Sequence, residues 1–215
     1  MFRKELLILS LLALVLFLVV AAITSFALRA VQHDGYMLAE DTFPGLVDAG
    51  EAIDRLNENW FNLHLLLSVQ SPEAAENLIQ KITANSTEAA WRRYQESIFD
   101  KEDAQLFAQV QASRSKFLEV RARYFGLIRT GDTLAAKQLF AGDLGSAFDR
   151  YRRAAEDIFQ LNVRQGRARA DRLIQLSRWT PYALAAFCVM VLLAGVLVGF
   201  KASLGAFSGA WKENV

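Results

Sequence analysis

Arginine residues occur in short clusters along the middle of the chain, and their side chains are well suited to hold a charged ligand. The clusters are Arg92-Arg93, Arg121 with Arg123, and Arg150-Arg152-Arg153. A guanidinium group can donate two parallel hydrogen bonds to a carboxylate, so a pair of arginines on one helix face could bind an organic acid. The alternative is that these arginines are solvated and pair with nearby acidic residues such as Asp149, Glu156 and Asp157.

We predict that a ligand contacts the first and the last helix of this middle segment. Both helices can continue into an apolar segment of the chain, so a ligand that bridges them could move those segments. His64 flanks an apolar seam, and for it a role as a polar residue at the edge of the core is the alternative. The predicted ligand-binding residues are Arg55, Asn57 and His64 on the first helix and Arg150 and Arg153 on the last.

The sequence contains no catalytic constellation. His33 and His64 are too far apart for metal-ligand spacing on one helix, and the only cysteine, Cys188, allows neither an intrachain disulfide nor a thiolate metal site. A glycine-rich phosphate loop and a nucleophile elbow are both missing. The formal net charge of +1 creates no strong field toward nucleic acid. We therefore expect no enzyme, no metal, no cofactor and no nucleic-acid partner.

Two uncharged apolar segments, residues 6–28 and 179–200, bracket the charged middle of the chain. At ~1.5 Å per helical residue, each can span the ~30 Å hydrocarbon core of a lipid bilayer. The first segment exceeds the ~7–15 apolar residues of a signal peptide, so we interpret it as an uncleaved anchor. Neither segment contains Asp, Glu, Lys, Arg or His, which argues against a pump or transporter.

Basic residues flank the outer ends of both segments and predict the orientation in the membrane. Arg3 and Lys4 precede the first segment, and Lys201 and Lys212 follow the second. Because short basic flanks stay in the cytoplasm, we expect both termini there. The chain then divides into a transmembrane helix (6–28), a periplasmic or extracellular domain (29–178), a second transmembrane helix (179–200) and a short cytoplasmic tail (201–215) in the inner or plasma membrane.

The segment 29–178 is rich in helix-forming residues, and its apolar residues recur with alternating spacings of three and four. Ser71-Pro72-Glu73, residues 100–103 and Thr130-Gly131-Asp132 mark helix ends, and a short helix is expected over residues 133–141. Residues 41–45, with Pro44, should kink or interrupt the first helix. We predict an all-α, antiparallel up-down four-helix bundle flanked by two transmembrane helices.

This order of elements resembles the sensor region of methyl-accepting chemotaxis receptors, and more specifically their four-helix-bundle sensor domain family. The resemblance covers about residues 1–200 and is most evident over residues 121–171. Gly145-Ser146-Ala147 departs from it, since the family often has proline before the phenylalanine that opens the last helix. The matching motifs are Arg123-Tyr124, Leu127-Ile128-Arg129-Thr130-Gly131-Asp132, Ala135-Ala136 with Leu139, Ala147-Phe148, Leu161-Asn162 and Arg178-Trp179.

The resemblance implies a sensor that dimerises through its first helices and binds a small extracellular molecule, such as an organic anion or amino acid. The signal would pass as a small shift or rotation of the last helix. Residues 201–215 leave no room for the linker and signalling domain of such receptors. We therefore expect output in trans through a chemoreceptor or a histidine kinase.

Two other interpretations remain open at this point. The bundle could be a structural or adaptor protein that binds the helices of a partner and no metabolite, because regular apolar seams support that role equally well. The chain could also be the remnant of a receptor with no retained role.

Overall fold

The computed structural model describes residues 2–210, and within this part of the chain the secondary structure is helical without strands. The chain divides into two compact units. One unit contains the two ends of the chain, up to residue 35 and from residue 169, and the other contains residues 36–168. The all-α fold class is confirmed.

The unit that contains the chain ends is built from two helices that are long and apolar enough to cross a membrane. The helix α1 (Phe2–Met37) contains the apolar segment 6–28, and α7 (Gly145–Ala210) contains the segment 179–200. Phe17 and Leu192 are 70% and 69% exposed, as lipid-facing residues would be in a structure without a membrane. The predicted boundaries of the two spans stay predictions. Of the predicted tail, residues 201–210 belong to α7 and residues 211–215 lie outside the described part of the chain.

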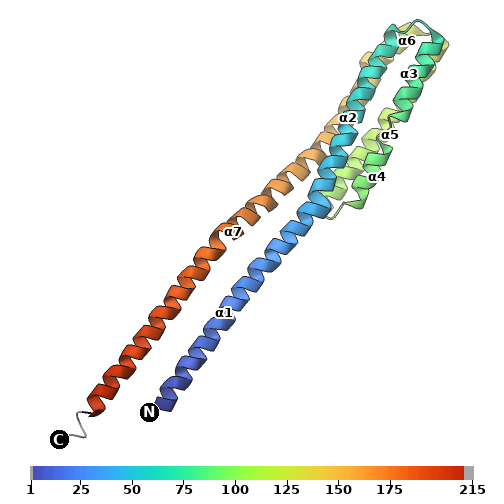
Figure 1. Ribbon diagram of the computed structural model, residues 1–215. Coiled ribbons are helices and arrows are strands. Elements are labelled where there is room, and N and C mark those ends of the chain that lie inside the picture. The colour runs from blue at the N-terminus through green and yellow to red at the C-terminus, as the bar shows by residue number, and fades with distance from the viewer. Residues whose placement is uncertain (1, 211–215) are drawn as a thin grey trace. The chain divides into compact units, whose positions relative to one another are not determined.

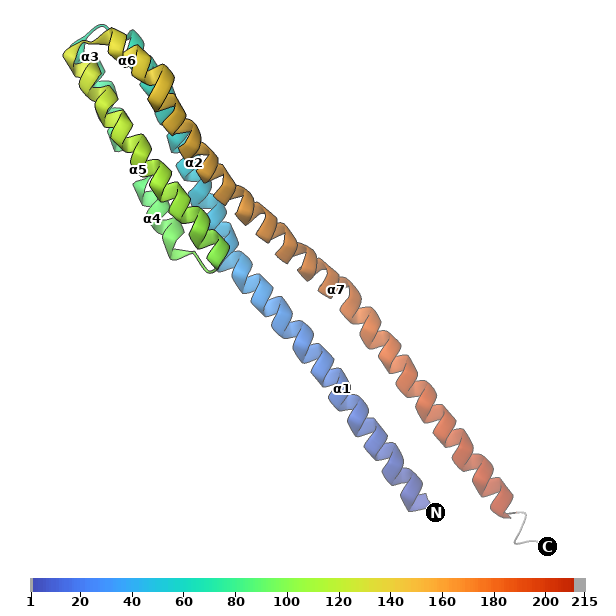
Figure 2. The same ribbon diagram turned by 180° about the vertical axis from the view of Figure 1, so that it is seen from behind.

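The second unit is a bundle of four antiparallel helical columns (Figures 1 and 2). The first column is α2 (Phe43–Leu65), and the second is formed by α3 (Pro72–Ala84) and α4 (Glu88–Glu96). The third is α5 (Lys101–Thr130), and the fourth is α6 (Thr133–Leu139) followed by the first part of α7. The predicted up-down four-helix bundle is thus confirmed, with its second column broken at residues 85–87.

The predicted helix boundaries agree with the capping contacts. The Ser71 hydroxyl accepts a hydrogen bond of 3.4 Å from the backbone nitrogen of Ala74, and Asp100 Oδ1 accepts one of 2.8 Å from that of Asp103. After α5, Gly131 adopts a φ of 74°, a conformation that glycine enters without steric cost. Each cap is a local interaction, so the sequence alone reveals it.

Two π-helices replace breaks that the sequence had suggested. Leu38–Thr42 joins α1 to α2, and Phe140–Leu144 joins α6 to α7. The expected kink at residues 41–45 is therefore a widened helical turn, and Pro44 lies in the first turn of α2. Gly142 and Gly145 likewise do not end the helix.

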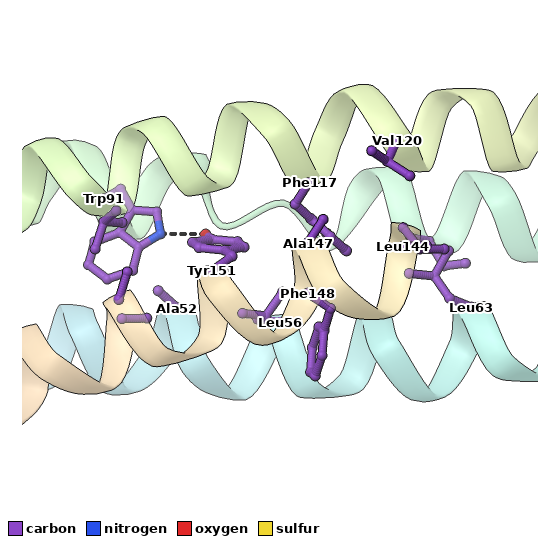
Figure 3. Packing of buried hydrophobic residues seen from close by; sticks show 14 of the residues in the cluster. Ala52, Leu56, Leu63, Trp91, Phe117, Val120, Leu144, Ala147, Phe148 and Tyr151 are labelled. Carbon is purple, nitrogen blue, oxygen red and sulfur yellow. Dashed lines mark hydrogen bonds between the residues drawn. The ribbon is translucent and has the colours of Figure 1, made fainter. Parts of the chain in front are cut away.

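The bundle core is packed with apolar side chains from every column (Figure 3). Leu56 of α2, Phe117 of α5 and Ala147 of α7 are each at most 1% exposed. Trp60 stacks between Phe140 and Phe148, with ring centroids 4.6 Å and 4.2 Å away. Such contacts fix the register between columns and thereby determine which polar side chains meet inside the bundle.

Candidate functional site

The three predicted ligand-binding residues on α2 have different surroundings. Arg55 already pairs with Glu51 at 2.8 Å, and its Nη1 donates a hydrogen bond of 3.4 Å to Asn85 Oδ1. Asn57 is exposed. His64 is also exposed, and its ring lies edge-on to Phe140 with centroids 5.4 Å apart.

The two predicted residues on α7, Arg150 and Arg153, are both exposed. Arg153 Nε donates a hydrogen bond of 3.2 Å to the backbone oxygen of Asp149, one turn earlier. Within residues 2–210, no hydrogen bond or ion pair joins any two of the five predicted residues. Their role in binding stays a prediction that needs a ligand to be tested.

A different set of polar residues comes together inside the bundle, and we call it the arginine pocket. Its apolar wall includes Leu56 and Phe117, and its enclosed volume is about 10 Å³. Residues of α2, of the break before α4, of α5 and of α7 all contribute, so every column of the bundle reaches this point. The polar residues of the arginine pocket are Asn59, Ser86, Thr87, Arg114, Arg121 and Tyr151.

The hydroxyl of Tyr151 is the centre of a buried hydrogen-bond network beside the arginine pocket. It accepts a hydrogen bond of 2.6 Å from Trp91 Nε1 and lies 2.8 Å from Thr87 Oγ1 (Figure 3 shows the first contact). Burial raises the pKa of Tyr151, so its hydroxyl stays protonated. Arg114 Nε donates a hydrogen bond of 3.3 Å to the same Thr87 oxygen. A chain of polar contacts therefore connects Arg114 on α5 to Tyr151 on α7.

A second polar layer crosses the bundle at Tyr94. Its hydroxyl donates a hydrogen bond of 2.6 Å to Asp103 Oδ1 and accepts one of 2.8 Å from Asn162 Nδ2. Burial raises the pKa of Asp103 to about 6, and the negative charges of Asp100 and Asp41 also raise it. The layer ties α4, α5 and α7 together at one height of the bundle.

A larger hollow of about 770 Å³ lies where α3 begins and α5 ends. Leu66, Val69 and Ile128 are among its apolar residues. The charged residues in its wall are already paired, since Arg129 donates hydrogen bonds of 2.9 Å and 3.0 Å to both carboxylate oxygens of Glu76. This pairing makes the hollow a weaker candidate for a charged ligand than the arginine pocket.

Sequence reasoning identified Arg121 as part of an arginine cluster but did not select it for the site. The feature that could have identified Arg121 is its position on the face of α5 that carries core residues. Arg114, Phe117, Arg121 and Phe125 are separated by three or four residues, so they share one face of the helix, and that face also carries the core. Thr87 and Trp91 could not be found in this way, because Tyr151, the partner that they share, lies 64 and 60 residues away.

A family model described as a four helix bundle sensory module for signal transduction matches residues 3–173. The chain belongs to this family. A comparison with curated proteins found no match. The family assignment identifies the bundle as a chemoreceptor-like sensory module, and the two apolar helices are its candidate membrane spans. The family is a signalling family and not a catalytic one.

Proposed function

We propose that this sensory module is anchored by two membrane spans, detects a small molecule outside the cytoplasm and transmits the signal through α7. The observation that carries the proposal is the continuity of α7. Tyr151 and Ile158, on its first part, are at most 1% exposed inside the bundle. The same helix then includes Pro181 and the apolar segment 179–200, and it continues to Ala210.

A continuous helix can pass a small displacement along its own axis. Helix shifts of ~1–2 Å are typical of allosteric switching at packed interfaces. Because the core residues of α7 are close-packed, a ligand that repositions them must move the helix backbone or leave a void. A shift or rotation of α7 is therefore the expected signal.

The proposed topology places the bundle on the periplasmic or extracellular side and both termini in the cytoplasm, as the flanking basic residues suggest. This orientation can be tested with single-cysteine variants in which Cys188→Ser removes the native thiol. Asn57→Cys in the bundle should react in intact cells with a maleimide that does not cross membranes. Failure of Asn57→Cys to react until the cells are opened would reverse the proposed topology.

We further propose that the module forms a homodimer along α2. Phe43, Val47 and Phe61 are 58%, 67% and 62% exposed, and their spacing places them on one stripe of the helix together with Leu65. An exposed apolar stripe of this kind is typical of a protein interface. Phe61→Glu should convert a dimer into a monomer in detergent, as measured by light scattering, whereas Gln109→Glu, at an exposed position of α5, is the control outside the stripe.

The partner that receives the signal is proposed to be a chemoreceptor or a histidine kinase in the same membrane. Chemical cross-linking in native membranes, followed by affinity purification and mass spectrometry, tests this part. Recovery of such a receptor or kinase supports output in trans. Recovery of a partner that binds equally well with and without any small molecule would favour the adaptor interpretation.

The central experiment measures the movement of α7 directly. Single cysteines are placed along residues 179–200 in the Cys188→Ser background, and disulfide cross-linking between copies is measured in native membranes. A panel of organic acids, amino acids and neutral sugars is first screened for binding by isothermal titration of the full chain in micelles. For a compound that binds, the cross-linking yields should change with the helical period.

Two results would contradict the proposal. One is a compound that binds tightly but leaves all cross-linking yields unchanged, because binding would then not be coupled to α7. The other is a panel with no binding compound at all, because the bundle would then behave as a structural element. Cysteines placed at exposed positions of α5, such as Lys116→Cys, control for general changes in membrane packing.

A further inference from the structure

Arg121 has no carboxylate partner within the described part of the chain. Its guanidinium carbon lies 5.5 Å from the ring centroid of Phe125 and 6.0 Å from that of Phe117. Both distances are within the range in which a cation is attracted to an aromatic face. The two rings therefore hold the charged group in position and leave its N–H donors free for another acceptor.

A second guanidinium reinforces the positive charge at this point. Arg114 lies two helical turns before Arg121 on the same face of α5, and its side chain is only 14% exposed. It forms an ion pair with Glu88, whose side chain is 64% exposed. Burial lowers the pKa of Arg121, and the charge of Arg114 lowers it further. Two guanidinium groups and one exposed carboxylate therefore leave a net positive charge at this point.

The other polar residues of the arginine pocket are neutral. Asn59, Ser86, Thr87 and Tyr151 contribute amide and hydroxyl groups, and no acidic residue is among the described residues that line it. The enclosed volume of about 10 Å³ is close to the space that one water molecule needs. A carboxylate group has three non-hydrogen atoms and is larger than one water molecule, so its entry must widen the arginine pocket.

We propose that Arg121 and Arg114 bind the carboxylate group of a small organic acid in the arginine pocket. The assignment rests on the proposed sensory function and names the site and the ligand class for it. The planar fork of a guanidinium matches a carboxylate with two parallel hydrogen bonds, and Arg121 has its donors free for such an arrangement. Partial burial strengthens the interaction, because water competes less for the ions.

The position of the arginine pocket also explains how binding would reach the helices that enter the membrane. Thr87 Oγ1 lies within hydrogen-bond distance of both Arg114 and the Tyr151 hydroxyl on α7. A carboxylate that draws Arg114 toward Arg121 would weaken the contact with Thr87 and so change the environment of Tyr151. On the opposite wall, Leu56 and Asn59 belong to α2, which follows α1 through the π-helix Leu38–Thr42.

The test is isothermal titration of the full chain in detergent micelles with acetate, pyruvate and succinate as probes. Acetamide serves as a neutral analogue, and chloride and sulfate at matched ionic strength distinguish a carboxylate site from a general anion site. Arg121→Gln removes the unpaired charge, and Arg123→Gln, at an exposed position two residues later, is the matched control. Circular dichroism confirms that each variant remains helical.

If the proposal is correct, at least one of the three carboxylates binds and acetamide does not. Arg121→Gln should weaken the binding tenfold or more, as loss of a charged hydrogen-bond partner does, and Arg123→Gln should leave it unchanged. Carboxylate binding that is unaffected by Arg121→Gln, absence of carboxylate binding, or equal binding of chloride and sulfate would each overturn the proposed site.

The coupling of the arginine pocket to α7 is a separate measurement. Carboxylate binding that depends on Arg121 but leaves the cross-linking of α7 unchanged would contradict the proposed function and leave the site intact.

Discussion

The hydroxyl of Tyr94 donates a hydrogen bond of 2.6 Å to Oδ1 of Asp103, although α4 and α5 are separated by a turn that reverses the direction of the chain. The contact is buried, since Tyr94 is 0% and Asp103 is 4% exposed. Two opposing effects act on the pKa of the Asp103 carboxyl group. Burial raises it by favouring the neutral form, and the hydrogen bond from Tyr94 lowers it by favouring the charged form.

Asp103 should therefore make the stability of the bundle depend on pH. Burial raises its pKa from an ordinary value of 3.8 to about 6, so the folded protein binds this proton more tightly than the unfolded chain. The resulting stabilisation is present at low pH and is lost as the pH rises from about 4 to about 6, with a size on the order of 3 kcal/mol.

Asp103→Asn tests this dependence while keeping an oxygen that can accept the Tyr94 hydrogen bond. The melting temperature of the full chain in micelles, followed by circular dichroism, should fall between pH values of about 4 and 6 more steeply for the wild type than for the variant. Identical pH profiles for the two proteins would show that Asp103 is not responsible.

The close approach of Gly45 to Asn162 should make that glycine difficult to replace. A Cβ at Gly45 would lie 2.5 Å from Asn162 Oδ1, whereas one at Gly50 would lie 3.9 Å from Phe159. Gly45→Ala should cost about 1–3 kcal/mol in the free energy of unfolding, because Asn162 must move away from Tyr94. Gly50→Ala, on the same helix, should be neutral or slightly stabilising, since alanine favours helix. Equal melting temperatures for the two variants would contradict the packing described.

Removal of the Tyr151 hydroxyl should lower the free energy of unfolding of the bundle, although it deletes only one atom of the side chain. Tyr151→Phe leaves the indole N–H of Trp91 without its acceptor in a buried place, and an unsatisfied buried donor costs about 1–3 kcal/mol. Tyr36→Phe makes the same chemical change at a position that is 58% exposed and lies outside the apolar segments, and it should have no effect. Urea unfolding monitored by tryptophan fluorescence would measure both. A wild-type midpoint for Tyr151→Phe would show that the network is energetically unimportant.

Two buried asparagines should respond in opposite directions to the same substitution. Asn62 is 3% exposed, and its Nδ2 has no hydrogen-bond partner in the described part of the chain, so Asn62→Leu should stabilise by about 1 kcal/mol. Asn162 is 2% exposed, but its Nδ2 donates to Tyr94, so Asn162→Leu should lower the melting temperature. Destabilisation by Asn62→Leu would indicate that a water molecule satisfies the amide.

The helical columns and their ends could be predicted because they depend on local features. Apolar spacing along the chain marks the core face, and caps such as Ser71 and Asp100 act within one turn of their own position. The break between α3 and α4 could not be predicted, because it depends on contacts across the bundle. Asn85 Nδ2 donates a hydrogen bond of 3.0 Å to Glu58 Oε2, and Asn59 Nδ2 donates one of 2.7 Å to the Asn85 carbonyl.

The contacts of the interior polar residues could likewise not be predicted from the sequence. Val110 and Phe117 are seven residues apart, a spacing that marks one face of a helix, and both are buried in the core. Sequence reasoning could not determine that Arg121, on the next turns of that face, lines the same pocket as Thr87 and Tyr151, because this requires the register of three columns. The predicted residue Arg153 instead contacts its own helix, and Arg55 contacts Glu51 one turn earlier and Asn85 in the break between α3 and α4.

The π-helix Phe140–Leu144 has a consequence for how related chains can differ in length. A π-turn contains about one residue more than an α-turn, so a deletion within it can restore an ordinary α-helix. A deletion within α7 would instead turn every later side chain by ~100° and remove Tyr151 or Ile158 from the core. Evolution can therefore add or remove single residues at this turn, and the α6 end of the bundle can diversify while α7 keeps its inherited register.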